Sequence, residues 1–364
     1  MSFFGSNKIL GVDIGTSSIK VVEMSKSSGR YKLENYGIIE VGRSGEAMNE
    51  AIQTAGAKQP RLSEDEAAGG IIEILRRTGI TTRDAVLSIP SYLTFSTVIN
   101  MPYVSEEELA NAVSFEARKY VPVPVSEVML DWSIINVVGE SRQIVPDAET
   151  EKKKPANVEV FLVAVPKSEI EKYQRIMKKA GLNMKVLETE SFALIRSLVG
   201  NDLSPVAIVN IGSKGTAIML VDNGVERINQ NIDFGGFEIT KNIALAMKAS
   251  FAKADDIKKT NGLLPDNPAV AGVISASVDK IITETLRIAQ NYENSRGVKM
   301  SKVIVIGGIL SMPGFLEYFR SGVGGTVDIG NALARVVIAP ELETLRNDLS
   351  STLAVAVGLA MRGV

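Results

Sequence analysis

The side chains available to this chain limit the chemistry it can do. Its 364 residues include no His and no Cys. Catalytic triads built on His, imidazole metal sites, thiol catalysis and disulfides are therefore excluded. Any chemistry must use carboxylates, lysines, hydroxyl groups, backbone amides or a bound ion. The lack of Cys is also what we expect of an intracellular protein.

A stretch near the N-terminus brings several of these groups together. Residues 8–24 have the pattern of a strand, a polar turn at Gly15–Ser18 and a second strand. Such a turn can direct several backbone N–H groups at one point and so bind an anion. Asp13 precedes the turn and Lys20 follows it, which adds a carboxylate for hydrated Mg²⁺ and a cation. These groups suit a polyphosphate, although the pattern also fits an ordinary hairpin.

The same pattern returns in the second half of the chain. The segment Val12–Thr16 aligns without a gap with Val209–Ser213, and both continue through a polar turn into a second apolar run. Two copies of one hairpin, one in each half, predict two similar domains that face each other across a cleft. The repeat favours phosphate binding over an ordinary hairpin. The second copy carries Asn210 where the first has Asp13.

The overall composition is that of a globular protein of two or more domains. Hydrophobic residues make up 45% of the chain and charged residues 23%. The net charge of −2 provides no basic field for nucleic acid. The N-terminus lacks the apolar region of a signal peptide, and no apolar run is long enough to span a bilayer. We therefore expect any membrane association to be peripheral.

Apolar periodicity and cap residues predict alternating strands and helices. Capping boxes are expected at Ser63 with Glu66, Ser105 with Glu108 and Ser168 with Glu171. Helices are predicted at 63–77, 105–120, 168–180, 191–199, 236–247, 254–260, 268–292 and 351–361. Strands are predicted at 31–41, 85–90, 93–101, 128–138, 158–166 and 184–187, besides the two hairpins and a buried strand from 303.

Three segments need separate interpretation. Residues 42–59 are predicted to be a loop with a weak helix, and residues 139–157 a mobile hairpin loop. The order strand–strand–helix–strand–strand from about 84 to 166 predicts a compact inserted subdomain. The Gly-Gly turn after the strand from 303 offers a flat backbone surface for a base or sugar, because glycine has no Cβ, or it simply ends the strand.

Five segments now occur in a fixed order. They are the hairpin at 11–23, a helix at 188–198, the hairpin at 206–221, the Gly-Gly turn at 303–314 and the terminal helix at 352–362. This order resembles the actin-like ATPase superfamily, whose motifs run phosphate 1, connect 1, phosphate 2, adenosine and connect 2. Within it, the chain is similar to the PilM family of type IV pilus assembly proteins. That similarity lies in Gly11–Glu23, Asn100–Pro102, Glu106–Leu109, Glu116–Pro122 and Val355–Gly363.

The resemblance implies an α/β, actin-like fold, that is, a duplicated ribonuclease H-like fold of two domains. A small α+β subdomain of the SHS2 type replaces subdomain 1B of actin. The implied divisions are 1–83 and 167–203 for subdomain 1A, 84–166 for the inserted subdomain 1C, 204–227 and 302–350 for subdomain 2A, 228–301 for subdomain 2B, and 351–364 for a helix that returns to 1A.

The resemblance also implies ATP or ADP with Mg²⁺ between the two halves. Asp13 would hold the hydrated ion, and Glu190 matches the position that often orients the attacking water. The residues expected to contact nucleotide are Asp13, Gly15, Thr16, Ser17, Ser18, Lys20, Gly212, Ser213, Lys214, Gly215, Gly236, Thr240, Lys258, Lys259, Gly307, Gly308, Ile309 and Met312. Among these, Gly236 and Thr240 begin a helix whose N-terminal dipole favours anions.

Two residues depart from the family pattern. Asn210 stands where the second hairpin usually has Asp, and an amide can neither balance Mg²⁺ charge nor act as a base. Nucleotide binding is expected to survive on Asp13 and the backbone amides, whereas hydrolysis is expected to be slow or absent. Lys214 stands where Gly is usual, and it would either add charge to the phosphate site or point to solvent.

The functional expectation is an assembly adaptor. In the family the partner is the short cytoplasmic N-terminal tail of the membrane protein PilN, bound as an extended peptide. The candidate contacts are Met101, Pro102, Tyr103, Tyr120 and Pro122, which could equally belong to the core and turns of the inserted subdomain. Other pilus platform proteins are further expected partners, and the protein would be cytoplasmic and reach the inner membrane only through its partners.

Two other functions share this core. A sugar-kinase-like phosphotransferase would need a second substrate pocket with an acidic base in the first domain, and the sequence offers no such loop. An FtsA-type cell-division filament protein would carry an amphipathic membrane helix after a linker, whereas this sequence stops directly after its terminal core helix. Both remain alternatives to the adaptor.

Overall fold

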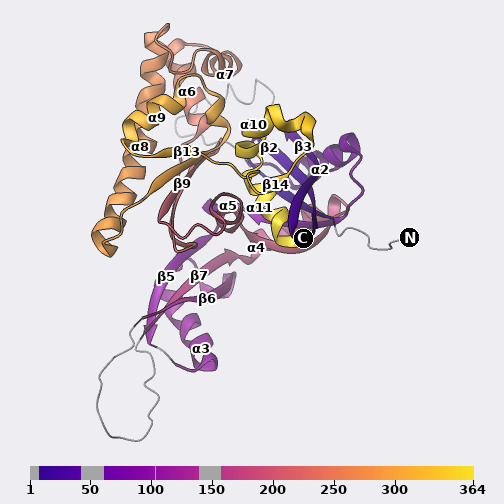
Figure 1. Cartoon of the computed structure of the whole chain (residues 1–364), viewed down its shortest axis with the longest axis vertical. Helices are drawn as coiled ribbons and strands as arrows, with labels where there is room; N and C mark the ends of the chain where they lie inside the picture. The colour runs from indigo at the N-terminus through magenta and orange to yellow at the C-terminus, as the bar shows by residue number, and fades with distance from the viewer. Residues whose placement is uncertain (1–7, 42–60, 103, 139–156) are drawn as a thin grey trace, which may run out of the picture.

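The computed structural model describes residues 8–41, 61–102, 104–138 and 157–364. Most of its residues fall into two α/β halves and one smaller subdomain (Figure 1). The loop predicted at 42–59, all but the last residue of the loop predicted at 139–157, and Tyr103 lie outside the described residues. No helix within the described ranges combines the length and the apolar character needed to cross a bilayer.

The first half is built on a six-stranded sheet. Its order is β14-β3-β2-β1-β4-β8, in which β1, β2 and β3 are antiparallel neighbours and β4 and β8 run parallel to β1. The strands are β1 (Ile9–Ile14), β2 (Ser18–Ser27), β3 (Arg30–Glu40), β4 (Asp84–Ile89), β8 (Asn183–Thr189) and β14 (Val336–Val337).

The second half repeats this arrangement. Its sheet has the order β11-β10-β9-β12-β13, again with three antiparallel strands followed by two parallel ones. The strands are β9 (Val206–Ile211), β10 (Thr216–Asp222), β11 (Val225–Ile232), β12 (Lys302–Ile306) and β13 (Val327–Ile329). The repeated hairpin in the sequence thus correctly predicted two similar sheets.

Helices cover both faces of the first sheet. On one face α2 (Glu64–Thr78) and α4 (Lys167–Lys179) pack over the apolar side chains of β1 and β2. On the other face lie α5 (Glu190–Leu194), its π-helical continuation (Ile195–Val199) and α11 (Ala354–Gly363). Gly11 allows the close approach of α11, since a Cβ there would lie 1.9 Å from the carbonyl oxygen of Ala356.

Helix α11 also connects the two halves. One continuous apolar cluster contains residues of β1 and β2, of α5 and α11, and of β9, β10 and β12. In Figure 1 the yellow C-terminal segment lies between the two sheets. The far face of the second sheet is covered by a separate cluster formed with α6 (Gly236–Met247), α7 (Phe251–Thr260), α8 (Pro268–Arg296) and α9 (Phe315–Val323).

The inserted subdomain is a three-stranded antiparallel sheet with one helix. Its strand order is β5-β7-β6, and α3 packs on one face. The elements are β5 (Phe95–Pro102), α3 (Glu106–Glu116), β6 (Val128–Val138) and β7 (Asn157–Pro166), with short 3-10 turns at Ser91–Leu93, Ala117–Lys119 and Val125–Glu127. The strands and the helix predicted for residues 84–166 are all present, but the first of them, β4, pairs with β1 and β8 in the sheet of the first half, so the inserted subdomain begins only at β5.

A buried ionic cluster joins the inserted subdomain to the second half. Glu159 on β7 accepts hydrogen bonds from Arg227 on β11 at 2.9 Å and from Arg296 at the end of α8 at 2.6 Å. The Glu159 side chain is 3% exposed and that of Arg227 is 9% exposed. Nearby, Ser96 on β5 donates to the buried carboxylate of Glu226. The subdomain, which is inserted in the chain of the first half, is thus held by side-chain contacts to the second half.

Three predicted elements need correction. Helix α4 begins at Lys167 with Pro166 as its N-cap, so the capping box of Ser168 with Glu171 is wrong. The terminal helix is interrupted at Leu353, which separates α10 (Arg346–Thr352) from α11. The helix predicted at 105–120 ends at Glu116 and tightens into a 3-10 turn. The capping boxes before α2 and α3 are confirmed. The division of the chain into named subdomains stays a prediction.

Candidate functional site

A cavity of about 730 Å³ lies between the two halves of the molecule. Every residue that the sequence assigned to a nucleotide lines it, and so does Glu190. The cavity is also lined by Asn210, noted above as a departure from the family pattern, and by residues that the sequence did not indicate, among them Tyr92, Phe237, Phe251 and Asp255. The fold therefore gathers side chains from distant parts of the sequence around one space.

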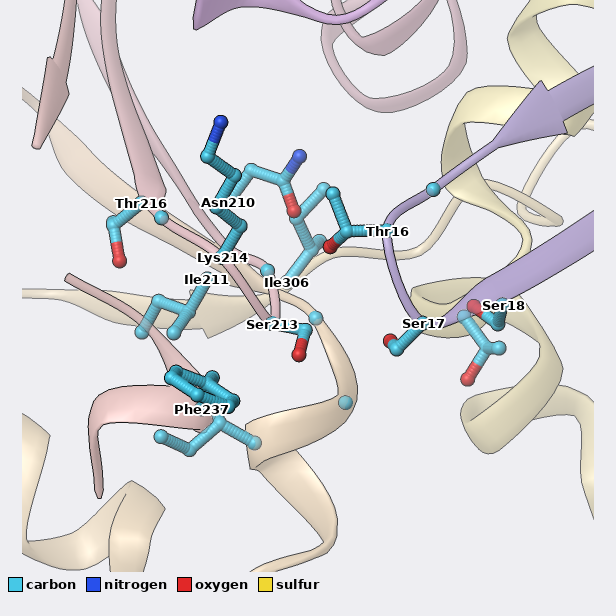
Figure 2. Close-up of a pocket in the computed structure, with 18 of the residues that line it drawn as sticks. Thr16, Ser17, Ser18, Asn210, Ile211, Ser213, Lys214, Thr216, Phe237 and Ile306 are labelled. Atoms are coloured by element: carbon cyan, nitrogen blue, oxygen red, sulfur yellow. The ribbon is translucent and has the colours of Figure 1, made fainter. Parts of the chain in front are cut away.

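The two hairpin turns face each other across this cavity. In each turn the glycine N–H donates to a carbonyl three residues on, Gly15 to Ser18 and Gly212 to Gly215, both at 2.9 Å. Figure 2 shows Thr16, Ser17 and Ser18 on one side of the space and Ser213 on the other. Two turns of the same local geometry thus present small polar side chains and backbone to a shared volume.

The two turns differ in charge. In the first hairpin Asp13 pairs across the strands with Lys20, and the Lys20 Nζ lies 3.2 Å from Asp13 Oδ2. In the second hairpin the pair at the corresponding positions is Asn210 and Ala217. At these two positions the second copy therefore has neither the carboxylate nor the cation, and its own charged side chain, Lys214, lies in the turn instead.

Helix α6 supports the second turn more than it faces the cavity. The N–H groups of Gly236 and Phe237, the first two residues of α6, donate to the carbonyls of Gly212 and Ser213 at 2.9 Å. Gly235 permits this contact, because a Cβ there would lie 2.4 Å from the Gly212 carbonyl oxygen. These two N–H groups are thus used within the protein, although the sequence analysis assigned the start of this helix to an anion.

Thr240 and Lys258 are likewise bonded to each other. Lys258 donates to the Thr240 hydroxyl and to the Asp255 carboxylate, both at 2.7 Å. Lys259 lies 2.9 Å from the other Asp255 oxygen. Burial alone would raise the pKa of Asp255, but the two lysines outweigh that effect and lower it. The pair Lys258 and Lys259 therefore lines the cavity as part of an ionic network centred on Asp255.

The Gly-Gly turn after β12 closes the same end of the cavity. Gly307 has a φ of +118°, and a Cβ there would lie 2.1 Å from the Ile211 carbonyl oxygen, so this position requires glycine. A Cβ on Gly308 would meet nothing within 4 Å, so Gly308 presents open backbone. Ile309 and Met312 are 8% and 5% exposed and pack mainly into the core behind the turn.

Glu190 lies at the floor of the cleft, at the first residue of α5. Its Oε1 accepts a hydrogen bond from the Asn210 Nδ2 at 2.7 Å, and its Oε2 accepts one from the Ser91 N–H at 3.4 Å. Burial, together with the nearby charge of Asp13, raises the pKa of Glu190 to about 7. Glu190 therefore holds a proton more readily than an ordinary glutamate does.

Residues missed by the sequence analysis line the cavity at two places. Phe237 and Phe251 form an aromatic pair with ring centroids 5.2 Å apart at the start of α6 and α7. Tyr92 lies under the ammonium group of Lys214, 4.1 Å from it. No spacing rule marks these residues, because each belongs to a different element and only the fold brings them together.

The five residues predicted to contact a partner separate in the structure. Met101 is 5% exposed and belongs to the core of the inserted subdomain. Pro102, Tyr120 and Pro122 are exposed, and Tyr103 lies outside the described residues. A second, open hollow of about 320 Å³ follows directly after Pro122, lined by Arg118, Val123, Pro124, Val125 and Ser126.

Comparison with known proteins identifies the family. A model of the type IV pilus assembly protein PilM matches residues 11–364. A chain of a solved PilM–PilN type IV pilus biogenesis complex is 20% identical to this one. The two superpose with a TM-score of 0.80, and the match covers 99% of each chain. MreB5 of Spiroplasma citri bound to AMPPNP is 13% identical, with a TM-score of 0.52 over 97% of this chain and 95% of that one. These solved structures confirm the predicted actin-like fold.

Two relatives among cell division proteins are matched over only part of their length. The cell division protein FtsA of Bacillus subtilis is 24% identical over 266 residues, which are 70% of this chain and only 58% of that protein. FtsA of Enterococcus faecalis is 23% identical over 85% of this chain and 75% of its own length. The family match, in contrast, extends over nearly the whole sequence, and the chain therefore belongs to the PilM family of type IV pilus assembly proteins.

Proposed function

We propose that this chain is a nucleotide-binding scaffold of the type IV pilus assembly machinery. It binds ATP or ADP in the cavity between its halves and the N-terminal tail of PilN beside the inserted subdomain. The observation that carries the nucleotide proposal is the pair of matching turns, Gly15–Ser18 and Gly212–Gly215, that face one cavity. The bound nucleotide of the MreB5 structure, which shares the fold, supports it.

The phosphates would lie between the two turns. Backbone N–H groups and the hydroxyls of Thr16, Ser17 and Ser213 would donate to phosphate oxygens, and Lys20 would add positive charge. Gly308 and the aromatic pair at the other end would contact the nucleoside. The cavity of about 730 Å³ is large enough for a nucleoside triphosphate.

The residues present fit Mg²⁺ only as an ion shared with the nucleotide. Within the described part of the chain, no group of three or more acidic side chains could hold a metal ion. Asp13 is a single buried carboxylate that lines the cavity, and Lys20 already neutralises part of its charge. Asp13 would therefore hold Mg²⁺ through water, while phosphate oxygens supply the charge that binds the ion. When bound, Mg²⁺ would neutralise charge on the phosphates.

Hydrolysis is expected to be slow or absent. A general base must be ionised and free to accept a proton from water. Both oxygens of Glu190 are already engaged, since one accepts the Asn210 amide and the other accepts the Ser91 N–H. Asn210 itself cannot replace the missing carboxylate. The site would thus bind nucleotide and hydrolyse it slowly or not at all, which suits a scaffold better than an ATPase.

The partner proposal rests on the family and on surface geometry. The PilM–PilN complex contains a chain of the same fold over its whole length. Tyr120 and Pro122 lie exposed next to the open hollow on the inserted subdomain, where an extended peptide could bind. The protein would be cytoplasmic and would reach the inner membrane only indirectly, through PilN. Other pilus platform proteins would be further partners.

Calorimetric titration tests the nucleotide site. Mg·ATP should bind the wild-type chain, and Asp13→Ala should abolish the binding heat. Asp266→Ala, an exposed aspartate outside the cavity, is the matched control and should bind as the wild type does. Equal affinity of the Asp13 variant and the wild type would remove the phosphate-site assignment.

A peptide titration tests the adaptor role. A peptide copied from the start of the cognate PilN should bind the full chain, and Tyr120→Asp should weaken that binding. Leu203→Asp changes an even more exposed apolar side chain, on the linker before β9, and should leave the affinity unaltered. The absence of any binding at high peptide concentration, with and without ATP, would refute the adaptor role.

A further inference from the structure

Two side chains of the second hairpin contact the first half at the floor of the cleft. Lys214 places its Nζ 4.1 Å from the centroid of the Tyr92 ring, and Asn210 donates to Glu190 at 2.7 Å. In Figure 2, Lys214 and Asn210 extend to the same side of the turn, away from Ser213. The second hairpin therefore lines the cavity and also contacts the opposite half directly.

The two contacts reach a single linked surface of the first half. Tyr92 belongs to the 3-10 turn Ser91–Leu93, which connects β4 to the first strand of the inserted subdomain. The N–H of Ser91 donates to Glu190, so the Tyr92 turn and the start of α5 are themselves joined. A rotation that opens the cleft must separate Lys214 from Tyr92 and Asn210 from Glu190.

The environment of Tyr92 suits a cation on its face. The ring is half-buried, and burial raises the pKa of Tyr92, so the phenol stays neutral at physiological pH. An ammonium group over a partly desolvated aromatic face is an attractive cation–π pair. Lys214 thus has a role that neither sequence-based alternative described, because it bonds to the opposite half of the protein.

We propose that Lys214 and Tyr92 form a clasp that holds the cleft closed and slows the release of bound nucleotide. The release part of this inference rests on the proposed nucleotide-binding function. The clasp acts as a positioning device, since it holds the second turn in place through the root of the inserted subdomain. Opening of the cleft must break it before a nucleotide can leave.

Dissociation of a fluorescent ATP analogue, chased with excess ATP, tests the effect on release. Tyr92→Leu and Lys214→Gln should each speed release by about two- to ten-fold. The double variant should add little to either single change, because both remove the same contact. Tyr92→Phe keeps the aromatic face and should release nucleotide at nearly the wild-type rate. If Lys214→Gln weakens binding while Tyr92→Leu behaves as the wild type, Lys214 is a phosphate ligand and the clasp is refuted.

A distance measurement in the nucleotide-free protein tests the clasp independently. Because the chain has no Cys, spin labels can be placed at Arg77→Cys on α2 and Asp256→Cys on α7, both exposed. Tyr92→Leu and Lys214→Gln should shift the distance distribution to longer values, and Tyr92→Phe should not. Unchanged distributions in both variants would overturn the clasp, whereas failure of the wild type to bind ATP would overturn the proposed function alone. Lys214→Gln keeps the test available if Tyr92→Leu does not fold.

Discussion

The buried Glu159 cluster provides a quantitative test of how the inserted subdomain is held. Replacement of Glu159 by Gln keeps the shape of the side chain but removes the charge that Arg227 and Arg296 share. The consequence differs for the two arginines. The side chain of Arg296 is 42% exposed and can return to water, whereas that of Arg227 is 9% exposed and cannot.

The expected loss follows from this difference. Removal of one partner from a buried ion pair costs about 3–5 kcal/mol, because the remaining charge stays buried without compensation. Since the Gln oxygen can still accept one hydrogen bond and only Arg227 is fully trapped, we expect Glu159→Gln to lower the free energy of unfolding by about 2–4 kcal/mol. With a urea dependence of roughly 2 kcal/mol per molar, the unfolding midpoint falls by about 1–2 M.

Tryptophan fluorescence can measure this loss of stability. The only Trp of the chain is Trp132, which packs against the core of the inserted subdomain, so its fluorescence during urea unfolding reports on that subdomain. Glu73→Gln removes exposed ion pairs with Arg76 and Arg77 and should leave the midpoint nearly unchanged. A Glu159→Gln midpoint that matches that of the Glu73 control would refute the argument that this cluster anchors the subdomain.

Two further predictions concern the cleft and the core. The pKa of Glu190 is raised to about 7, so between pH 4.5 and 7 the folded protein holds a proton that the unfolded chain has released. The contribution of this group to stability therefore decreases as pH rises through 7. Glu190→Gln should remove that part of the pH dependence of thermal unfolding, and an unaltered profile would contradict the assignment. Gly11→Ala should destabilise the protein by about 1–3 kcal/mol because its Cβ would overlap α11. Gly69→Ala, at an exposed position of α2 with open space around it, should instead stabilise the protein slightly. Equal effects of the two changes in thermal denaturation would contradict the packing described for α11.

Much of the fold was predictable because its signals are local. The hairpin of residues 8–24 and its copy around Asn210 indicated two similar sheets, and the strand order confirmed them. The caps before α2 and α3 were readable because a capping box is defined by residues three positions apart. The predicted cap of α4 failed because Pro166, whose φ is fixed, is the N-cap, two residues before Ser168.

The candidate site was predictable in its members but less so in their contacts. The residues predicted to contact nucleotide follow motifs, and all of them line one cavity in the structure. Their hydrogen-bond partners do not follow motifs. Thr240 with Lys258, Asn210 with Glu190 and Lys214 with Tyr92 each join different elements, so the packing of those elements against one another decides whether they meet.

The attachment of the inserted subdomain has a mechanical consequence. Its polypeptide enters from β4 and leaves into α4, so two covalent connections tie it to the first half. Its links to the second half include the Glu159 cluster and the hydrogen bond of Ser96, which are non-covalent. A pulling force on the subdomain therefore loads the two halves unequally, and the side held by ion pairs yields first.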